Sequence, residues 1–387
     1  RHRFNAGFDW SNSNQRSEFK AGHFIETAGE RTVDIENNRV ITLDYAGSYF
    51  FEIPQLPMLA FTTSWGGQLN DREASGLRSD SRSFINRGNT VIQQGGDLFN
   101  STEDRRGFIN GGFFAQQQVG INNQLFITGG FRFDSFNSVN ERLEAEPQYQ
   151  FFPKLQAAYT VSDHLWWPAD LVETFRLRAA WGEAGDPPNA TSSRTLWDTR
   201  ETGRGNLGFV VNQIGNTNLE AERTGEWEIG ADISALQGRV NVSGQYFRRE
   251  TTGGIVDNDP IPSLGIIEPT AFNAGEWASW GYEATVDVNI LDTRDFRWNV
   301  NTSYQYLDNE IEAIGRNADG EIAFDPGTGT SGFRPGFPFP GIFRERILNA
   351  DQRGELPQYS DSAEFIGINF PPQEISISTT VGIGSRL

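Results

Sequence analysis

Residues 276–290 read EWASWGYEATVDVNI, and this stretch decides the fold class. From Trp280 to Ile290 every second residue is apolar, and the residues between them are Gly, Glu, Thr, Asp and Asn. Because successive side chains of a strand point to opposite faces, a period of two predicts a β-strand with one apolar and one polar face. Many long strands of this kind favour a membrane-spanning β-barrel over the core of a soluble enzyme.

The same alternation recurs along the whole chain. It is found in the segments 40–53, 125–134, 151–162, 175–181, 222–233, 296–306 and 374–383. We expect the apolar members to face lipid, among them Leu177, Ala179, Trp181, Ile229, Ala231, Val286 and Val288. The polar members are expected on the concave side, and the candidates for a lumen-facing role are Arg132, Arg176, Arg178, Glu228 and Asp232. Asp287 is expected on that side as well.

These segments predict an all-β fold, an antiparallel up-and-down transmembrane β-barrel, of which this chain supplies part. We count roughly twelve strands, many of roughly 9–14 residues. They start near residues 3, 39, 57, 107, 123, 150, 173, 222, 238, 277, 295 and 373. The segment 69–106 is the least clear, and residues 84–94 are read either as part of a strand pair above the membrane or as a loop.

Short and long connections alternate between the predicted strands. The short ones are 121–124, 235–238 and 292–295, and the long ones are 184–218, 250–275 and 308–362. Outer-membrane barrels have short periplasmic turns and long external loops, and the long loops carry function. The candidate external-loop aromatic residues for contact with a ligand or a lid protein are Trp197, Phe209, Phe272, Phe333, Phe337 and Phe339. Packing of these rings within the loops is an equally good interpretation.

Composition excludes several classes of site. There is no cysteine, so disulfides, thiolate metal sites and cysteine nucleophiles are excluded. The three histidines lie far apart in sequence, and the net charge of -19 argues against a nucleic-acid partner. No run of 20 apolar residues occurs, so no transmembrane helix is expected. The ten tryptophans favour an aromatic girdle at the membrane interfaces, with Trp10, Trp65, Trp181, Trp277, Trp280 and Trp298 near strand ends. Ordinary packing of a β-protein is the alternative.

Four segments carry a family resemblance. Residues 215–255 (GNTNLEAERTGEWEIGADISALQGRVNVSGQYFRRETTGGI) enter a strand of the form W-x-x-G-x-D from a G-N-x-x-L-x-x-E loop end. Residues 272–311, residues 112–134, and the pair 152–163 and 175–186 show further matching hairpins in the matching order. Together they resemble the barrel of the SusC/RagA family of TonB-dependent outer-membrane transporters.

This resemblance implies active import of a bulky nutrient of the glycan or peptide class across the bacterial outer membrane. It also implies a plug domain, the TonB–ExbB–ExbD energy complex and a SusD-like lipoprotein as partners, with outer-membrane lipid around the barrel. Residues 1–387 are expected to form part of the barrel domain, with no plug domain in this stretch. Both ends of the sequence are read as cuts within a longer chain.

Other functional interpretations remain open at this point. A passive porin, an adhesin barrel and a soluble all-β carbohydrate-binding protein or glycosidase are the alternatives. Paired carboxylates such as Asp257 and Asp259 lie in Gly- and Asn-rich loops, so we expect solvated charge and no catalytic site. Residues 317–321 match part of a calcium loop, but a turn is the better interpretation. No cofactor and no metal are expected.

Overall fold

The computed structural model of the chain describes residues 1–24, 27–84, 91–139, 148–189, 191–202, 206–258, 260, 262–266, 268–315, 331–352 and 354–384. The chain forms two compact units. The first unit comprises residues 1–49, 64–115 and 132–151. The second unit comprises residues 50–63, 116–131 and 152–387. Among the described residues, no helix is long and apolar enough to cross a membrane.

The strands follow one another in a meander. Backbone hydrogen bonds join twelve of them in the order β1-β2-β3-β4-β5-β6-β7-β10-β11-β12-β13-β17. Their bounds are β1 His2–Phe19, β2 Glu30–Glu52, β3 Leu59–Phe84, β4 Gly95–Ile121, β5 Leu125–Val139, β6 Gln148–Thr160, β7 Val172–Asp186, β10 Glu222–Ala235, β11 Val240–Asn258, β12 Thr270–Asp292, β13 Phe296–Ile314 and β17 Gln373–Ile383. The strand pairs of this sheet whose register the structure describes are antiparallel, so the predicted all-β antiparallel architecture is confirmed.

Strand lengths differ from the expectation of 9–14 residues. β6, β10 and β17 fall within that range, but β2, β3 and β4 have 23, 26 and 27 residues. The least clear segment, 69–106, lies mostly in β3 and β4, with a short 3₁₀ turn Ile92–Gln94 before β4. Residues 85–90, at the centre of the ambiguous 84–94 segment, lie outside the described residues. A lipid-facing period of two identifies only the part of a strand that crosses the hydrocarbon, so polar extensions were missed.

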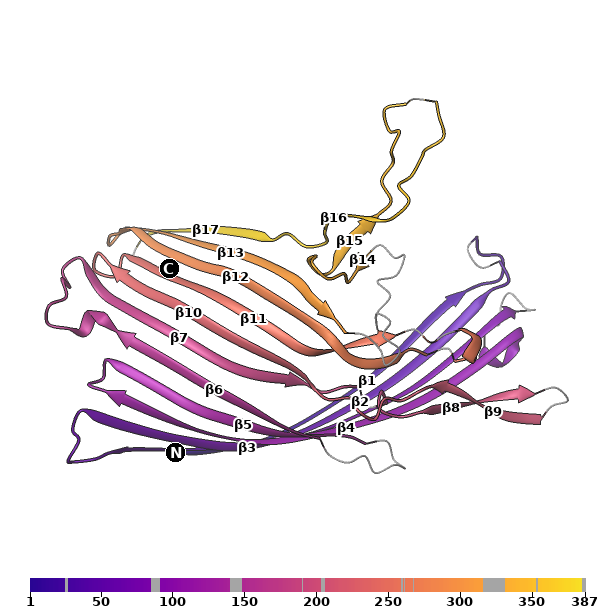
Figure 1. The fold of residues 1–387 in the computed structure, drawn as a ribbon, viewed down its shortest axis with the longest axis horizontal. Coiled ribbons are helices and arrows are strands. Elements are labelled where there is room, and N and C mark those ends of the chain that lie inside the picture. The colour runs from indigo at the N-terminus through magenta and orange to yellow at the C-terminus, as the bar shows by residue number, and fades with distance from the viewer. Residues whose placement is uncertain are drawn as a thin grey trace. The chain divides into compact units, whose positions relative to one another are not determined.

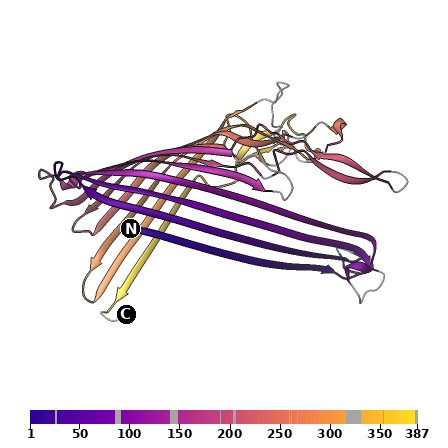
Figure 2. The same ribbon diagram turned by 90° about the horizontal axis from the view of Figure 1, so that it is seen from below.

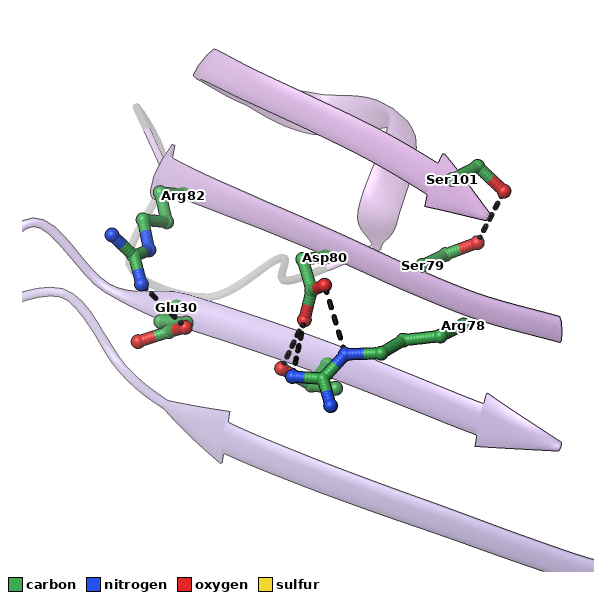
Figure 3. Close-up of polar contacts among 7 residues, drawn as sticks. Glu30, Arg78, Ser79, Asp80, Arg82 and Ser101 are labelled. Atoms are coloured by element: carbon green, nitrogen blue, oxygen red, sulfur yellow. Dashed lines mark hydrogen bonds and ion pairs between the residues drawn. The ribbon is translucent and has the colours of Figure 1, made fainter. Parts of the chain in front are cut away.

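The distal part of β3 in the first unit is such an extension. From Asp71 to Ser83 most side chains of both faces are polar. Here Arg82 pairs with Glu30 on β2 at 3.1 Å, and Asp80 accepts hydrogen bonds from Arg78 and from Thr32. Figure 3 shows these contacts beside the Ser79–Ser101 hydrogen bond between β3 and β4. If this segment crossed the membrane, the polar side chains on one of its faces would contact hydrocarbon and would have no water to hydrate them. This part of the strand therefore lies outside the hydrocarbon.

In the second unit, β7, β10, β11, β12, β13 and β17 lie side by side (Figure 1), and the orange to yellow strands run together in Figure 2. Short turns link β4 to β5, β10 to β11 and β12 to β13. Because each strand reverses direction, these turns share one rim and the long connections share the other. The predicted loop 250–275 is much shorter than expected, since β11 runs to Asn258 and β12 begins at Thr270. Phe272 therefore lies in a strand.

The long connections contain small sheets of their own. The β7–β10 connection holds the hairpin β8 Leu196–Thr202 and β9 Asn206–Gln213. The β13–β17 connection holds β14 Ser331–Gly332, β15 Gly341–Arg344 and β16 Glu364–Ile368, which pair as one three-stranded sheet. The sequence patterns predicted neither sheet, because their strands are short and do not alternate cleanly.

Candidate functional site on the polar face

The register of the second unit separates apolar from polar side chains. Leu177 lies opposite Ala231, and Ala179 opposite Ile229, in one row of the β7–β10 pair. Arg176 lies opposite Asp232 in the other row, which also contains Arg178 and Glu228. Directly paired residues of an antiparallel ladder share a face. The apolar and polar sets predicted for β7 and β10 are therefore on opposite faces, which we call the apolar face and the polar face.

β11 and β12 continue both faces. Val242 lies opposite both Ile233 and Val286, which extends the apolar face. Asp287 lies opposite Asn241, which extends the polar face. On the apolar face Ile229 is 57% exposed, so the face is open to surrounding lipid rather than packed against protein in this unit.

A polar network crosses four strands on the polar face. Arg178 forms an ion pair with Asp232 (Nε–Oδ2 3.1 Å), and Ser243 donates a hydrogen bond to Asp232 (2.8 Å). Arg178 also donates to Gln245 (3.3 Å), whose amide donates to Glu283 (2.9 Å). The network links β7, β10, β11 and β12 and holds the guanidinium of Arg178 between Asp232 and Gln245.

A hollow of about 310 Å³ lies beside this network. The small residues Ala158, Ala180 and Gly230 line it, together with Arg178 and Glu228. Gly230 is constrained here, because a Cβ atom would lie 2.9 Å from the carbonyl oxygen of Gly244. Two of the predicted lumen-facing residues thus line one concavity. Asp232 supports Arg178, and Arg176 is exposed on the same face.

Arg132 belongs to the first unit and is held differently. Its Nε donates to both carboxylate oxygens of Asp134, at 2.8 and 2.7 Å, and its Nη2 donates to Gln68 at 3.3 Å. The neighbouring strand carries Gly112, where a Cβ atom would lie only 1.7 Å from Asp134 Oδ1. Glycine at position 112 therefore makes the room that this ion pair needs.

A second, larger hollow of about 530 Å³ lies near the long-loop end of the polar face. We call it the aromatic cleft, and it is lined by Gly182, Glu183, Ala184, Thr224, Glu226, Arg249, Thr251, Trp277, Ser279 and Phe339. Glu226 lies directly opposite Arg249 in the ladder, and the two form an ion pair (Nη2–Oε2 2.8 Å). The rings of Trp277 and Phe339 meet with centroids 5.9 Å apart at 59°. The cleft thus presents aromatic faces beside a charged pair.

Two glycines give Trp277 its position. A Cβ atom at Gly254 or Gly275 would lie 2.1 or 2.4 Å from the indole ring. The ladder between β11 and β12 is irregular at Gly254, so the strand bends where the indole lies over it. Trp277 was expected in the membrane girdle, and that expectation was wrong. Position 277 is odd, whereas Trp280 and Tyr282 hold even positions, so the period of two places Trp277 on the other face of the strand. The sequence alternation alone therefore already indicated the polar face for Trp277.

Phe339 reaches the cleft from the β13–β17 connection. β17 pairs with β13 only as far as Tyr306. Beyond that point residues 331–343, which we call the strap, follow β13 instead, since Ile311 donates to the Phe337 carbonyl (3.1 Å) and Gly336 donates to the Ile311 carbonyl (2.8 Å). Ile311 is 2% exposed and Asn309 7%, so the strap covers an otherwise open strand edge.

The predicted loop aromatics have separate roles. Phe337 packs against Phe343 and Phe365 within the strap and its sheet, with centroids 5.4 and 5.3 Å apart. Phe333 stacks on Phe339 at 6.1 Å. Trp197 and Phe209, on the β8–β9 hairpin, are 60% and 75% exposed, and Phe272 is half-buried opposite Val256. Sequence reasoning missed Asn309 and Arg249, which carry no motif of their own, and it placed Glu226 on the polar face of its strand without a site role.

Among the described residues no group of three or more His, Asp and Glu side chains is placed to hold a metal ion. The calcium-like segment 317–321 and the residues Asp259, Asp319 and Asp325 lie outside the described residues. The arrangement is suited to holding a ligand by ring contact and hydrogen bonding.

Comparison with known proteins places the chain. Residues 1–369 match the family "TonB dependent receptor-like, beta-barrel". TonB-dependent receptor P3 of Formosa agariphila is 21% identical over 266 residues, which cover 66% of this chain and 25% of that protein. TonB-dependent receptor SusC of Bacteroides thetaiotaomicron is 22% identical over 238 residues, covering 56% of this chain and 22% of SusC.

Solved structures show the same fold. The RagAB peptide transporter superposes with a TM-score of 0.80 at 15% identity, covering 99% of this chain and 44% of that one. The outer-membrane transporter YddB from Escherichia coli gives a TM-score of 0.55 at 11% identity, covering 91% of this chain and 48% of that one. The chain thus spans about a quarter of the curated relatives it matches. It belongs to the TonB-dependent receptor-like β-barrel family of the bacterial outer membrane.

Proposed function

We propose that the full-length protein is an active transporter that imports a bulky nutrient, of the glycan or peptide class, across the outer membrane. The observation that carries this proposal is the family match over residues 1–369. The SusC relative and the fold of the RagAB peptide transporter support it. The family consists of receptors and transporters rather than enzymes, and this favours import over a glycosidase or a soluble binding protein.

The aromatic cleft is the part of this chain that we assign to nutrient contact. Aromatic faces bind sugar rings or apolar side chains, and the Glu226–Arg249 pair offers acceptors and donors beside them. Trp277 comes from the wall and Phe339 from the strap. A nutrient in the cleft therefore contacts both the barrel and a long connection.

The polar face is proposed to line the solute path. Arg176, Arg178, Glu228 and Asp232 supply it in the second unit, and Arg132 is proposed as a lumen-facing residue of the first unit, considered by itself. Charged side chains with fixed partners are suited to the wall of a water-filled channel. The network around Arg178 keeps its guanidinium from folding into the path. The candidate aromatics Trp197 and Phe209 remain candidates for a lid contact, since their exposed rings lie on a hairpin of a long connection.

The partners of the full-length protein follow from the same proposal. They are its own plug domain, the TonB–ExbB–ExbD complex and a SusD-like lipoprotein, with outer-membrane lipid against the apolar face. Residues 1–387 then supply part of the barrel domain.

Growth tests this proposal. Cells with and without the gene are grown on a panel of single oligosaccharides and peptides as sole carbon or nitrogen source. We expect growth on at least one to be lost when the gene is deleted, and lost equally when TonB is deleted. Gene-dependent growth that persists without TonB would establish a passive porin instead. Unchanged growth on every compound would remove the importer assignment.

A further inference from the structure

The turn between β6 and β7, residues 161–171, carries an exposed cluster of leucine and tryptophan side chains at the short-turn rim, where the β2–β3 turn also exposes Leu56 and Met58. The β6–β7 turn contains the sequence VSDHLWWPADL, and Leu165, Trp166 and Leu171 are 106%, 69% and 61% exposed. The turn between β12 and β13 on the same rim, residues 293–295, reads Thr-Arg-Asp. Exposed leucine and tryptophan side chains at one point of a rim mark a contact with something apolar.

The exposed side chains sit on a fixed backbone. The neighbouring turns hold it from both sides, because Gln124 donates its side-chain amide to the Asp163 carbonyl (2.9 Å) and Leu236 donates to the Leu171 carbonyl (3.1 Å). Trp167 donates from Nε1 to the Val172 carbonyl (2.6 Å). The turn is therefore tied down, and the exposure of its apolar side chains belongs to its folded conformation.

Ring contacts place the turn on the apolar face. Trp167 stacks on Phe175 (5.5 Å, 14°), and Phe175 is in the row that continues as Leu177 and Ala179. On the other side, Tyr159 bonds to His164, and the His164 ring stacks on Trp166 (5.6 Å, 14°). Tyr159 lies opposite Leu177, so it is in the same row.

We propose that residues 164–167 form an anchor that inserts into the lipid interface at the short-turn side of the outer membrane. The partner is the phospholipid surface itself. The apolar face of β6 and β7 already faces lipid, and the cluster extends it without interruption. Tryptophan suits this depth because its ring is apolar while its N–H is polar, and Trp167 has that N–H satisfied. Leu165 and Trp166 then have an apolar environment that water does not give them.

A depth measurement tests the anchor in the full-length protein. This chain contains no cysteine, so a single cysteine for a nitroxide label is introduced at Leu165 (L165C) after any cysteine elsewhere in the protein is replaced. The matched control is Arg294→Cys, in the exposed polar turn 293–295 of the same rim. The protein is reconstituted in vesicles of phosphatidylethanolamine and phosphatidylglycerol. Collision with apolar oxygen and with a water-soluble nickel chelate is read by power saturation.

We expect the label at position 165 to collide with oxygen at least threefold more, relative to nickel, than the label at position 294. Equal collision ratios at the two positions would show that the turn hangs in water and would overturn the anchor. Protection of position 165 from both reagents would show that protein covers the turn, which also overturns it. A second variant, Leu165→Ser with Trp166→Ser, should leave the folded barrel intact but make detergent extraction from the vesicles easier. Its extraction profile matching that of the unaltered protein would equally count against the anchor.

Discussion

Asn309 binds the backbone of Phe339 through both atoms of its side-chain amide. Nδ2 donates to the Phe339 carbonyl at 2.9 Å, and Oδ1 accepts from the Phe339 N–H at 2.7 Å. This is the pairing that another strand would make with β13, supplied instead by a side chain. It holds the strap at the height where the Phe339 ring meets Trp277.

We expect Asn309→Ala to release the strap without unfolding the barrel. Two hydrogen bonds at a buried position are lost, at about 1 kcal/mol each. Amide hydrogen exchange at Gly336, Phe337 and Phe339 should accelerate by about tenfold or more, consistent with that loss. Asn301→Ala, on the same strand and face, is the control and should leave the exchange of the strap unchanged. Equal exchange in Asn309→Ala and the unaltered protein would show that the strap is held by its own sheet alone.

Trp277→Ala and Phe339→Ala should each weaken nutrient uptake by full-length transporter. A ring contact of about 0.5–1.5 kcal/mol corresponds to a rise in the half-saturating concentration of roughly two- to tenfold. Uptake rates over a concentration series, with the maximal rate determined separately, measure this rise. Trp280→Ala is the control, because that ring lies on the apolar face under Arg248. A loss of affinity in the control as large as in Trp277→Ala would point to a general effect on folding.

The Gly112–Asp134 contact predicts a position that tolerates no side chain. Gly112→Ala would place Cβ 1.7 Å from Asp134 Oδ1, so the ion pair with Arg132 must move. We expect a destabilisation of about 1–3 kcal/mol, measured by urea unfolding of the refolded barrel. Gly67→Ala is the matched control, since the nearest atom to its Cβ is 3.5 Å away. The double variant Gly112→Ala with Asp134→Ala should recover part of the loss, and a loss that stays the same would rule out the clash as its cause.

Acid should loosen the distal part of β2 and β3 through Asp80. The hydrogen bond from Arg78 lowers the pKa of Asp80, and burial opposes this. A lowered folded pKa means that the carboxylate contacts stabilise the fold above the ordinary value of about 3.9 and are lost as the pH falls through the folded value. Pepsin should therefore cut this segment faster at pH 2 than at pH 4, relative to Asp80→Asn. If that variant shows the same change with pH, the dependence comes from other groups.

Much of this fold was readable from the sequence because lipid imposes a period of two. Predicted starts such as 222 and 373 coincide with those of β10 and β17, and the division of Leu177 from Arg178 was correct. The distal parts of β2 and β3 were missed because water contacts both of their faces, so no alternation marks them. The strap and Asn309 were missed because a side chain that replaces a strand is specified by three-dimensional contact rather than by spacing.

The most direct test of this account is the water accessibility of residues 176–181 in the full-length protein. Six single-cysteine variants, reconstituted in vesicles, are treated with a charged maleimide that does not enter lipid. We predict labelling at 176, 178 and 180, which share the polar face, and protection at 177, 179 and 181, which share the apolar face. Labelling of the odd positions with protection of the even ones, or equal labelling of all six, would contradict the assignment of these faces to lipid and to the solute path.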